Sequence, residues 1–259
     1  VRADTNETDE QVLTLKASAA SFATEMMNIF SFRTNNSAFS FYKAHSNANN
    51  DVEFNVRGDG EVSADGSFSG GGADYAEYFE WKDGNSSNED RVGYSVILDG
   101  NQIVKATSSD DTSKIIGVIS GNPAVVGDTA WNKWSKKHLK DDYGRYILEE
   151  YTVTEWYELS DDNQKTLIQY MTDEIPSDVT VPSDAKVTST EADGVTKLKR
   201  KKLNPDWNKS KTYIPREDRK EWDTVGLMGK LRILKGQPTG DRWIKMRDIS
   251  DTVEEWLVR

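Results

Sequence analysis

Residues 70–81 read Gly-Gly-Gly-Ala-Asp-Tyr-Ala-Glu-Tyr-Phe-Glu-Trp, and this stretch is the most informative part of the chain. Glycine lacks a Cβ atom and therefore reaches backbone conformations that other residues avoid. We interpret residues 70–73 as a hinge that presents the Ala73–Asp74 peptide bond in an exposed or strained geometry. The glycines of this hinge are Gly70, Gly71 and Gly72.

Two carboxylates follow the hinge, Asp74 and Glu77. The Asp74 carboxylate can reach the carbonyl carbon of Ala73 through a six-membered arrangement, so it is a candidate nucleophile, or it polarises the bond. Glu77 is the candidate acid or base, because two carboxylates that lie close together tend to separate in pKa. Such a pair can hydrolyse an amide without a metal, Cys or Ser. The same spacing is common in acidic chains, where its ordinary interpretation is a solvated entry into a strand.

The longer string from Gly72 to Trp81 closely resembles the signature of the self-cleaving C-terminal domains of phage tail spikes and neck appendages, the glutamic-type intramolecular-chaperone peptidases. The resemblance continues in order over about residues 58–259. Its further blocks are Asp83-Gly84-Asn85, Glu89-Asp90-Arg91, Gly93-Tyr94-Ser95-Val96, Ile116-Gly117-Val118-Ile119-Ser120-Gly121-Asn122-Pro123, Val126-Gly127-Asp128, Pro215-Arg216 and Glu221-Trp222-Asp223-Thr224-Val225-Gly226-Leu227-Met228-Gly229-Lys230. Several blocks in one order are far more specific than any single block.

The resemblance implies a single-turnover cleavage between Ala73 and Asp74, with Glu77 as the catalytic acid or base and Asp74 as the new N-terminus. Some relatives carry Ser before this Asp, whereas this chain has Ala73, so no hydroxyl is available for an N-to-O acyl shift. A carboxylate mechanism is compatible with this difference, and a serine mechanism is not. No cofactor is expected. Whether Glu77 acts on its own chain or on a neighbour stays open.

The composition changes at the hinge. Every Trp and Pro lies after it, and the short apolar stretches before it carry few large side chains. Such a segment cannot close a core of its own, but burial across a threefold axis would solve this, as in the intertwined β-stalks of phage fibres. We expect a mainly β fold with some α. The resemblance implies a trimeric β-stalk over residues 1–69, the hinge over 70–73, and a mixed, mainly β chaperone and peptidase domain over 74–259 with a loop-rich insert around 129–210.

Local patterns predict individual elements of this fold. Arg57-Gly58-Asp59-Gly60 is expected to form a tight turn between strands, and not an integrin-binding site. Ser160, with Asp161-Asp162 after it, predicts the capped start of a helix through Leu167, Ile168, Tyr170 and Met171. Strands are expected at 12–15, 39–42, 52–56, 92–97, 103–104 and 115–120, and a second core is expected from Trp222, Leu227, Leu231, Ile233, Trp243 and Trp256.

Composition excludes several classes of protein. The chain has no Cys, and its two histidines, His45 and His138, lie in different segments, so disulfides, a zinc site and a Ser-His-Asp triad are not expected. No apolar stretch is long enough to span a membrane. The basic run 197–202 is not expected to bind nucleic acid, because the net charge is −11 and the acidic segment 141–196 offers a partner.

A second group of aromatic residues leaves two interpretations open. Trp131, Trp134 and Tyr143 lie among lysines and could stack on a carbohydrate or a nucleotide. We favour packing of these aromatics on the domain or on a neighbouring subunit. Nothing in the sequence specifies a nucleotide pocket.

The resemblance implies the C-terminal part of a homotrimeric phage tail fibre, spike or appendage protein that assists trimerisation and then cuts itself. The alternative is a non-cleaving structural or receptor-binding tip that stays on the virion, and a weaker one is a glycan-hydrolysing tip. The expected partners are further copies of the chain, other tail or appendage proteins and a host surface glycan. The expected location is the virion, after assembly in the bacterial cytoplasm, and Val1 in place of Met indicates a piece of a longer protein.

Overall fold

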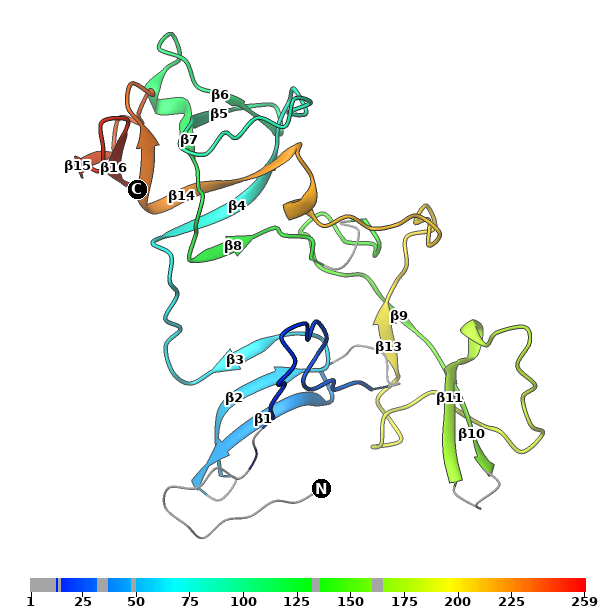
Figure 1. Ribbon diagram of the computed structural model, residues 1–259. Coiled ribbons are helices and arrows are strands. Elements are labelled where there is room, and N and C mark those ends of the chain that lie inside the picture. Colours follow the sequence, from blue (N-terminus) through cyan, green and yellow to red (C-terminus); the bar gives the residue numbers. More distant parts are fainter. Residues whose placement is uncertain (1–12, 14, 32–36, 48–49, 132–135, 160–164) are drawn as a thin grey trace. The chain divides into compact units, whose positions relative to one another are not determined.

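The computed structural model describes residues 13, 15–31, 37–47, 50–131, 136–159 and 165–259, and the chain divides into two compact units (Figure 1). The first unit comprises residues 1–67 and 148–201, and the second comprises 68–147 and 202–259. The regular elements are strands and short 3₁₀ helices, so the expected mainly β fold is confirmed. No helix within the described ranges is long and apolar enough to cross a membrane.

The first unit begins with the antiparallel sheet β1-β2-β3, formed by Ser40–Ser46, Asp51–Arg57 and Val62–Ala64. The predicted tight turn joins β2 and β3: Gly60 has a φ of +86°, and its N–H donates to the Arg57 carbonyl oxygen at 3.0 Å. The strand expected at 12–15 is not tested as a whole, because Val12 and Thr14 lie outside the described residues.

The first unit also contains the sheet β11-β10-β12, formed by Lys165–Met171, Val153–Leu159 and Lys186–Thr188, and the pair β9 (Leu148–Glu150) and β13 (Lys199–Lys201). The predicted helix is wrong, because its residues form β11, which pairs with β10 over its whole length. Aromatic and β-branched side chains favour this pairing, and Trp156 stacks on Tyr170 with ring centroids 5.7 Å apart. Ser160, Asp161 and Asp162 lie outside the described residues.

The second unit is built on β14 (Trp222–Leu234), which pairs with strands on both of its sides. Within the described ranges, its sheet runs β15-β16-β14-β7-β5-β6, and β4 also pairs with β14 and, in parallel, with β8. The remaining strands are β4 (Asp74–Glu80), β5 (Ser95–Asp99), β6 (Gln102–Lys105), β7 (Ile115–Ile119), β8 (Val125–Gly127), β15 (Ile244–Asp248) and β16 (Val253–Val258).

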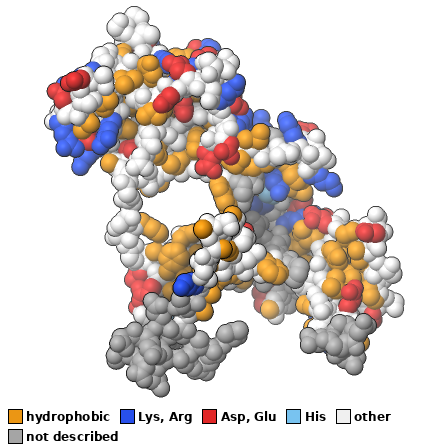
Figure 2. All heavy atoms as spheres, viewed as in Figure 1, with side chains coloured by type: hydrophobic (Ala, Val, Ile, Leu, Met, Phe, Trp, Pro, Cys, Tyr) orange, Lys and Arg blue, Asp and Glu red, His pale blue; other side chains and the backbone are white. Residues whose placement is uncertain are grey.

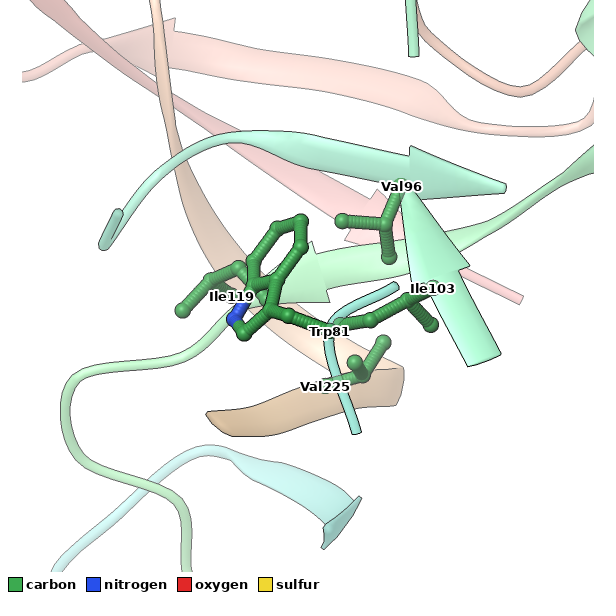
Figure 3. Packing of buried hydrophobic residues seen from close by; sticks show 5 residues of the cluster. All are labelled: Trp81, Val96, Ile103, Ile119 and Val225. Carbon is green, nitrogen blue, oxygen red and sulfur yellow. The ribbon is translucent and has the colours of Figure 1, made fainter. Parts of the chain in front are cut away.

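Two buried clusters fill the second unit. One contains Trp81, Val96, Ile103, Ile119 and Val225, which point toward one another from five segments (Figure 3). The other contains Val118, Leu231, Ile233 and Val258. Of the predicted second core, Leu231 and Ile233 are buried, and Leu227, Trp243 and Trp256 pack against the clusters. Trp222 instead lies under the Arg216 guanidinium, whose carbon is 4.0 Å from the ring centroid.

A buried arginine stabilises the chain where β4 ends. Arg91 is 5% exposed, and its guanidinium donates two hydrogen bonds to the Asp83 carboxylate, at 2.9 and 2.7 Å. Its carbon also lies 4.3 Å from the centre of the Trp81 ring. The bond to Arg91 lowers the pKa of Asp83 from 3.8 to about 2. The pair therefore connects the loop 82–91 to the first buried cluster.

This pair predicts a pH-dependent contribution to stability. Because the folded state lowers the Asp83 pKa, the contribution is complete above pH 3.8 and is lost as the pH falls through about 2. We expect Asp83→Asn to lower the free energy of unfolding at pH 7 by on the order of 1 kcal/mol, since solvent screens the exposed side of Asp83. The difference from wild type should shrink between pH 4 and pH 2 in urea titrations. Asp241→Asn is the matched surface control, and an equal pH profile for both variants would contradict this account.

Candidate functional site

The predicted cleavage bond lies at the start of β4, where β14 and the 122–124 segment hold it on two sides. The Ala73 carbonyl oxygen accepts a hydrogen bond from the Lys230 N–H at 3.2 Å. The Asp74 carbonyl oxygen accepts one from the Ala124 N–H at 2.8 Å. Both carbonyl groups that flank the Asp74 nitrogen are therefore fixed by backbone donors. The Lys230 N–H would also stabilise negative charge on the Ala73 oxygen during an addition to its carbonyl carbon.

Close backbone approaches explain two of the glycines around this bond. A Cβ atom on Gly72 would lie closer than 3.0 Å to backbone atoms of residues 122–124. Gly229 has a φ of +118°, and a Cβ atom there would collide with the Ala73 oxygen. Gly71, in contrast, has open space where its Cβ would be, and Gly70 meets only Ala124, beginning at 3.3 Å. Gly72 thus permits close packing, and Gly71 is the position with conformational room.

The bond borders a hollow of about 400 Å³ in the second unit. Val92, the segment 120–122 after β7, and residues of β14 and β16 complete its wall, and the sequence did not identify these as site residues. Of these residues, Ser120 and Lys230 do lie in blocks that carry the family resemblance, and this was the available signal. The lining residues are Gly71, Gly72, Ala73, Asp74, Val92, Ser120, Gly121, Asn122, Lys230, Leu231, Arg232 and Glu255.

Asp74 is a buried carboxyl group, with only 7% of the residue exposed. Its Oδ2 atom has no hydrogen-bond partner among the described residues, and it faces Gly226, where a Cβ would come within 2.8 Å of it. Burial raises the pKa of Asp74, and a hydrogen bond with the Ser120 side chain acts in the opposite direction. Asp74 therefore holds its proton to a higher pH than an exposed aspartate, which suits a proton donor.

Glu77 lies on the other face of β4, because successive side chains of a strand point to opposite faces. Its Oε1 atom accepts a hydrogen bond from the Tyr75 hydroxyl, and this bond raises the pKa of Tyr75. A Cβ atom on Gly127 of β8 would lie 2.8 Å from the Tyr75 oxygen and 2.9 Å from Glu77 Cγ. The structure thus brings Glu77 together with Tyr75 and Gly127, and it does not bring Glu77 together with Asp74.

The other sequence candidates are not among the residues that line this hollow. Arg200, in the basic run, pairs with Glu149 at 3.0 Å and also contacts Asp173 and Glu174, so the acidic partner that was expected is observed. Trp131 and Tyr143 are 66% and 85% exposed, and Trp134 lies outside the described residues. No group of three or more His, Cys, Asp or Glu side chains in the described part of the chain is arranged to hold a metal ion.

Comparison with known proteins gives consistent matches. The preneck appendage protein of Bacillus phage PZA and the pre-neck appendage protein of Bacillus phage phi29 are each 32% identical to this chain over 177 residues, or 67% of its length. The chain spans only 15% of the length of these relatives. The crystal structure of the pre-mature bacteriophage phi29 gene product 12 has a TM-score of 0.55 at 24% identity, covering 80% of this chain and 24% of that one, and so shares its fold.

The family model described as Peptidase_G2, IMC autoproteolytic cleavage domain matches residues 25–256, which is most of the chain. The ordered sequence blocks, the β-sheet that holds the Ala73–Asp74 bond and the similarity to phage appendage proteins agree with this match. The chain therefore belongs to the Peptidase_G2 family of IMC autoproteolytic cleavage domains.

Proposed function

We propose that residues 74–259 act as a self-cleaving intramolecular chaperone that hydrolyses the Ala73–Asp74 bond. The observation that supports this most strongly is the position of that bond beside a hollow. The Ala73 carbonyl oxygen accepts a hydrogen bond from the Lys230 N–H, and the next residue, Asp74, has a buried carboxyl group with a raised pKa. Residues 70–73 are the hinge in this proposal, and the segment 1–69 is the β-stalk that cleavage releases.

The proposed reaction is a simple hydrolysis. Water adds through its oxygen to the Ala73 carbonyl carbon, and a carboxylate takes the proton that water loses. We assign this carboxylate to Glu77, of the same chain or of a neighbouring copy. The negatively charged Ala73 oxygen accepts the hydrogen bond that the Lys230 N–H donates. The C–N bond then breaks, and Asp74 gives its carboxyl proton to its own nitrogen. The new Ala73 carboxyl group gives its proton to the Asp74 nitrogen, so Ala73 ends as a carboxylate and Asp74 as an N-terminal ammonium. Glu77 releases to solvent the proton that it took from water.

Cleavage at this point has a physical rationale. A β-stalk shared by three chains depends on contacts between distant residues and between chains, so it folds slowly and exposes strand edges on the way. A C-terminal domain that associates first would hold the three chains in register. Removing this domain afterwards would take away the template for the reverse process, so that the mature stalk is protected by a high barrier to unfolding.

The proposed setting follows from the relatives. They are neck appendage proteins of Bacillus phages, so we assign this chain to a homotrimeric appendage, tail spike or tail fibre of a virion. Assembly would take place in the bacterial cytoplasm, with other appendage or tail proteins as partners and a host surface glycan as the target of attachment. We propose no cofactor for the cleavage, since each step above uses groups of the chain and water.

The first test of this proposal is the mass of the purified protein. Wild type should yield fragments 1–73 and 74–259 on a denaturing gel and by intact mass. Asp74→Asn should slow cleavage by about 10²–10⁴-fold, because an amide cannot supply the proton. Ala73→Ser should be cut like wild type, since the proposed reaction does not use this side chain, and Asp241→Asn is the surface control. A wild-type trimer that remains uncut would exclude autoproteolysis and favour a retained structural or receptor-binding tip.

A glycine pair tests the packing around the bond. Gly72→Ala should lower the stability of the second unit by about 1–3 kcal/mol, because the new Cβ would collide with backbone atoms that cannot rotate away. It should also slow cleavage by shifting Ala73 relative to the Lys230 N–H. Gly71→Ala is the matched control, since its Cβ would meet nothing within 4 Å. Thermal unfolding and a cleavage time course measure both effects. Equal behaviour of the two variants would refute the role of Gly72 in packing the chain around the bond.

A further inference from the structure

The buried Asp74 carboxyl group has a neutral side chain as its polar neighbour. Figure 2 shows acidic and basic side chains interspersed over the visible surface of the second unit, whereas Asp74 is buried. Burial raises the pKa of Asp74, and a hydrogen bond with the Ser120 side chain lowers it. A bond that lowers the pKa favours the charged form, so the Ser120 hydroxyl donates and the carboxyl group accepts. Because Oδ2 has no partner among the described residues, the accepting atom is Oδ1.

The backbone of Ser120 is fixed on both sides of its Cα atom. Ser120 is 9% exposed and directly follows β7. Its N–H donates to the Thr224 carbonyl oxygen at 2.9 Å, and the Thr224 hydroxyl donates to the Ser120 carbonyl oxygen at 2.9 Å. Thr224 belongs to β14, the strand that also pairs with β4 and positions the Ala73–Asp74 bond. The Ser120 hydroxyl and the Asp74 carboxyl group are therefore held by the same strand.

Charged side chains also border the hollow. Lys230 and Arg232 come from β14 and Glu255 from β16, and the segment 120–122 contributes no charged side chain. The Glu255 Oε2 atom accepts a hydrogen bond from Arg247 Nε at 2.8 Å. On β4 itself, Glu77 points to the opposite face. The shift in the Asp74 pKa follows from burial and from Ser120 rather than from these charges.

We propose that Ser120 is the positioning residue for the proton transfer from Asp74, an inference that rests on the proposed autoproteolysis. The hydroxyl holds Oδ1, which leaves Oδ2 to carry the proton. When the C–N bond breaks, its electron pair stays on the Asp74 nitrogen, the Oδ2 proton moves to that nitrogen, and the side chain becomes a carboxylate. Hydrogen bonds to charged acceptors are stronger than those to neutral ones. Ser120 therefore stabilises the charge that develops on Asp74 as the proton leaves.

The pH dependence of the cleavage rate tests this role. Denatured uncut chains are refolded over a range of pH, and the fragments are followed by intact mass spectrometry. The wild-type rate should fall as the pH rises through the folded pKa of Asp74, because the donor loses its proton. Ser120→Ala should cut about 10–10²-fold more slowly below this fall, since one hydrogen bond to a developing charge is lost. Its fall should lie at a higher pH, because burial then acts on Asp74 without the opposing bond.

Further variants separate the hydroxyl from the shape of the side chain. Ser120→Thr keeps a hydroxyl and should retain the wild-type pH profile, whereas Ser120→Val has nearly the same shape without it and should behave like Ser120→Ala. This pair also decides the question should Ser120→Ala fail to fold. Ser95→Ala is the matched control, because Ser95 is fully buried in the same unit and its Oγ has no partner among the described residues. Its rate and pH profile should equal those of wild type.

The remaining outcomes distinguish this inference from the proposed function. If Ser120→Ala is cut at the wild-type rate, or more slowly with an unshifted pH profile, Ser120 has at most a structural role and the inference is wrong, while the proposed function stands. If the wild-type rate does not fall at high pH, Asp74 is not the proton donor, and the inference fails with that assignment. If wild type is never cut, the proposed function itself fails.

Discussion

The pairing of β4 with β14 is the interaction on which the rest of the site depends. It places Asp74 opposite Gly229 and positions the Ala73 carbonyl at the Lys230 N–H. A register shift between Gly226 and Met228 leaves Leu227 unpaired and changes which side chains of β14 share a face with β4. On one face, Leu231 joins the core near Asp74, and on the other Val225 joins the cluster around Trp81. The same strand pair thus holds the bond and both cores.

Asp74 affects both the proposed reaction and the stability of the fold. Burial of Asp74 without a partner for its Oδ2 atom destabilises the charged form, and the raised pKa is the consequence. A buried polar atom without a partner is unusual in a folded protein, and it is typical of positions where reactivity is needed. The stability that a protonated Asp74 contributes is present below the pKa of the unfolded chain and is lost as the pH rises through the higher folded value.

The sequence predicted some of this structure well, and the reasons are local. Glycine and aspartate in Arg57–Gly60 specify a tight turn whatever surrounds them, and the apolar runs at 103–104 and 115–120 are short and bounded by turn residues. The strand expected at 92–97 begins only at Ser95, because Gly93 has a φ of +88° and the Tyr94 N–H donates to the Arg91 oxygen in a turn. The helix predicted over 165–171 is wrong because the spacing of apolar residues there fits a helical repeat as well as a strand repeat. Pairing with β10 makes this stretch a strand.

The candidate site was harder to predict, since it depends on pairing between distant segments. The spacing of Asp74 and Glu77 suggested a carboxylate pair, but in a strand a separation of three residues places side chains on opposite faces. The contacts of Gly72 with residues 122–124, of Asp74 with Ser120 and of Ala73 with Lys230 each join parts of the chain that no local pattern connects. The sequence identifies Ala73–Asp74 as a candidate bond, whereas the groups that surround this bond become visible only in the fold.

The central claim is that the folded sheet presents the Ala73–Asp74 bond for hydrolysis. It is tested most directly by following folding and cleavage in the same samples. Denatured uncut wild-type chain is diluted into refolding buffer, formation of the sheet is followed by tryptophan fluorescence, and the fragments are identified by intact mass spectrometry. The account predicts that cleavage begins only after the sheet has formed and that the C-terminal fragment starts at Asp74. Cleavage of the denatured chain, or a fragment that starts at another residue, would contradict it.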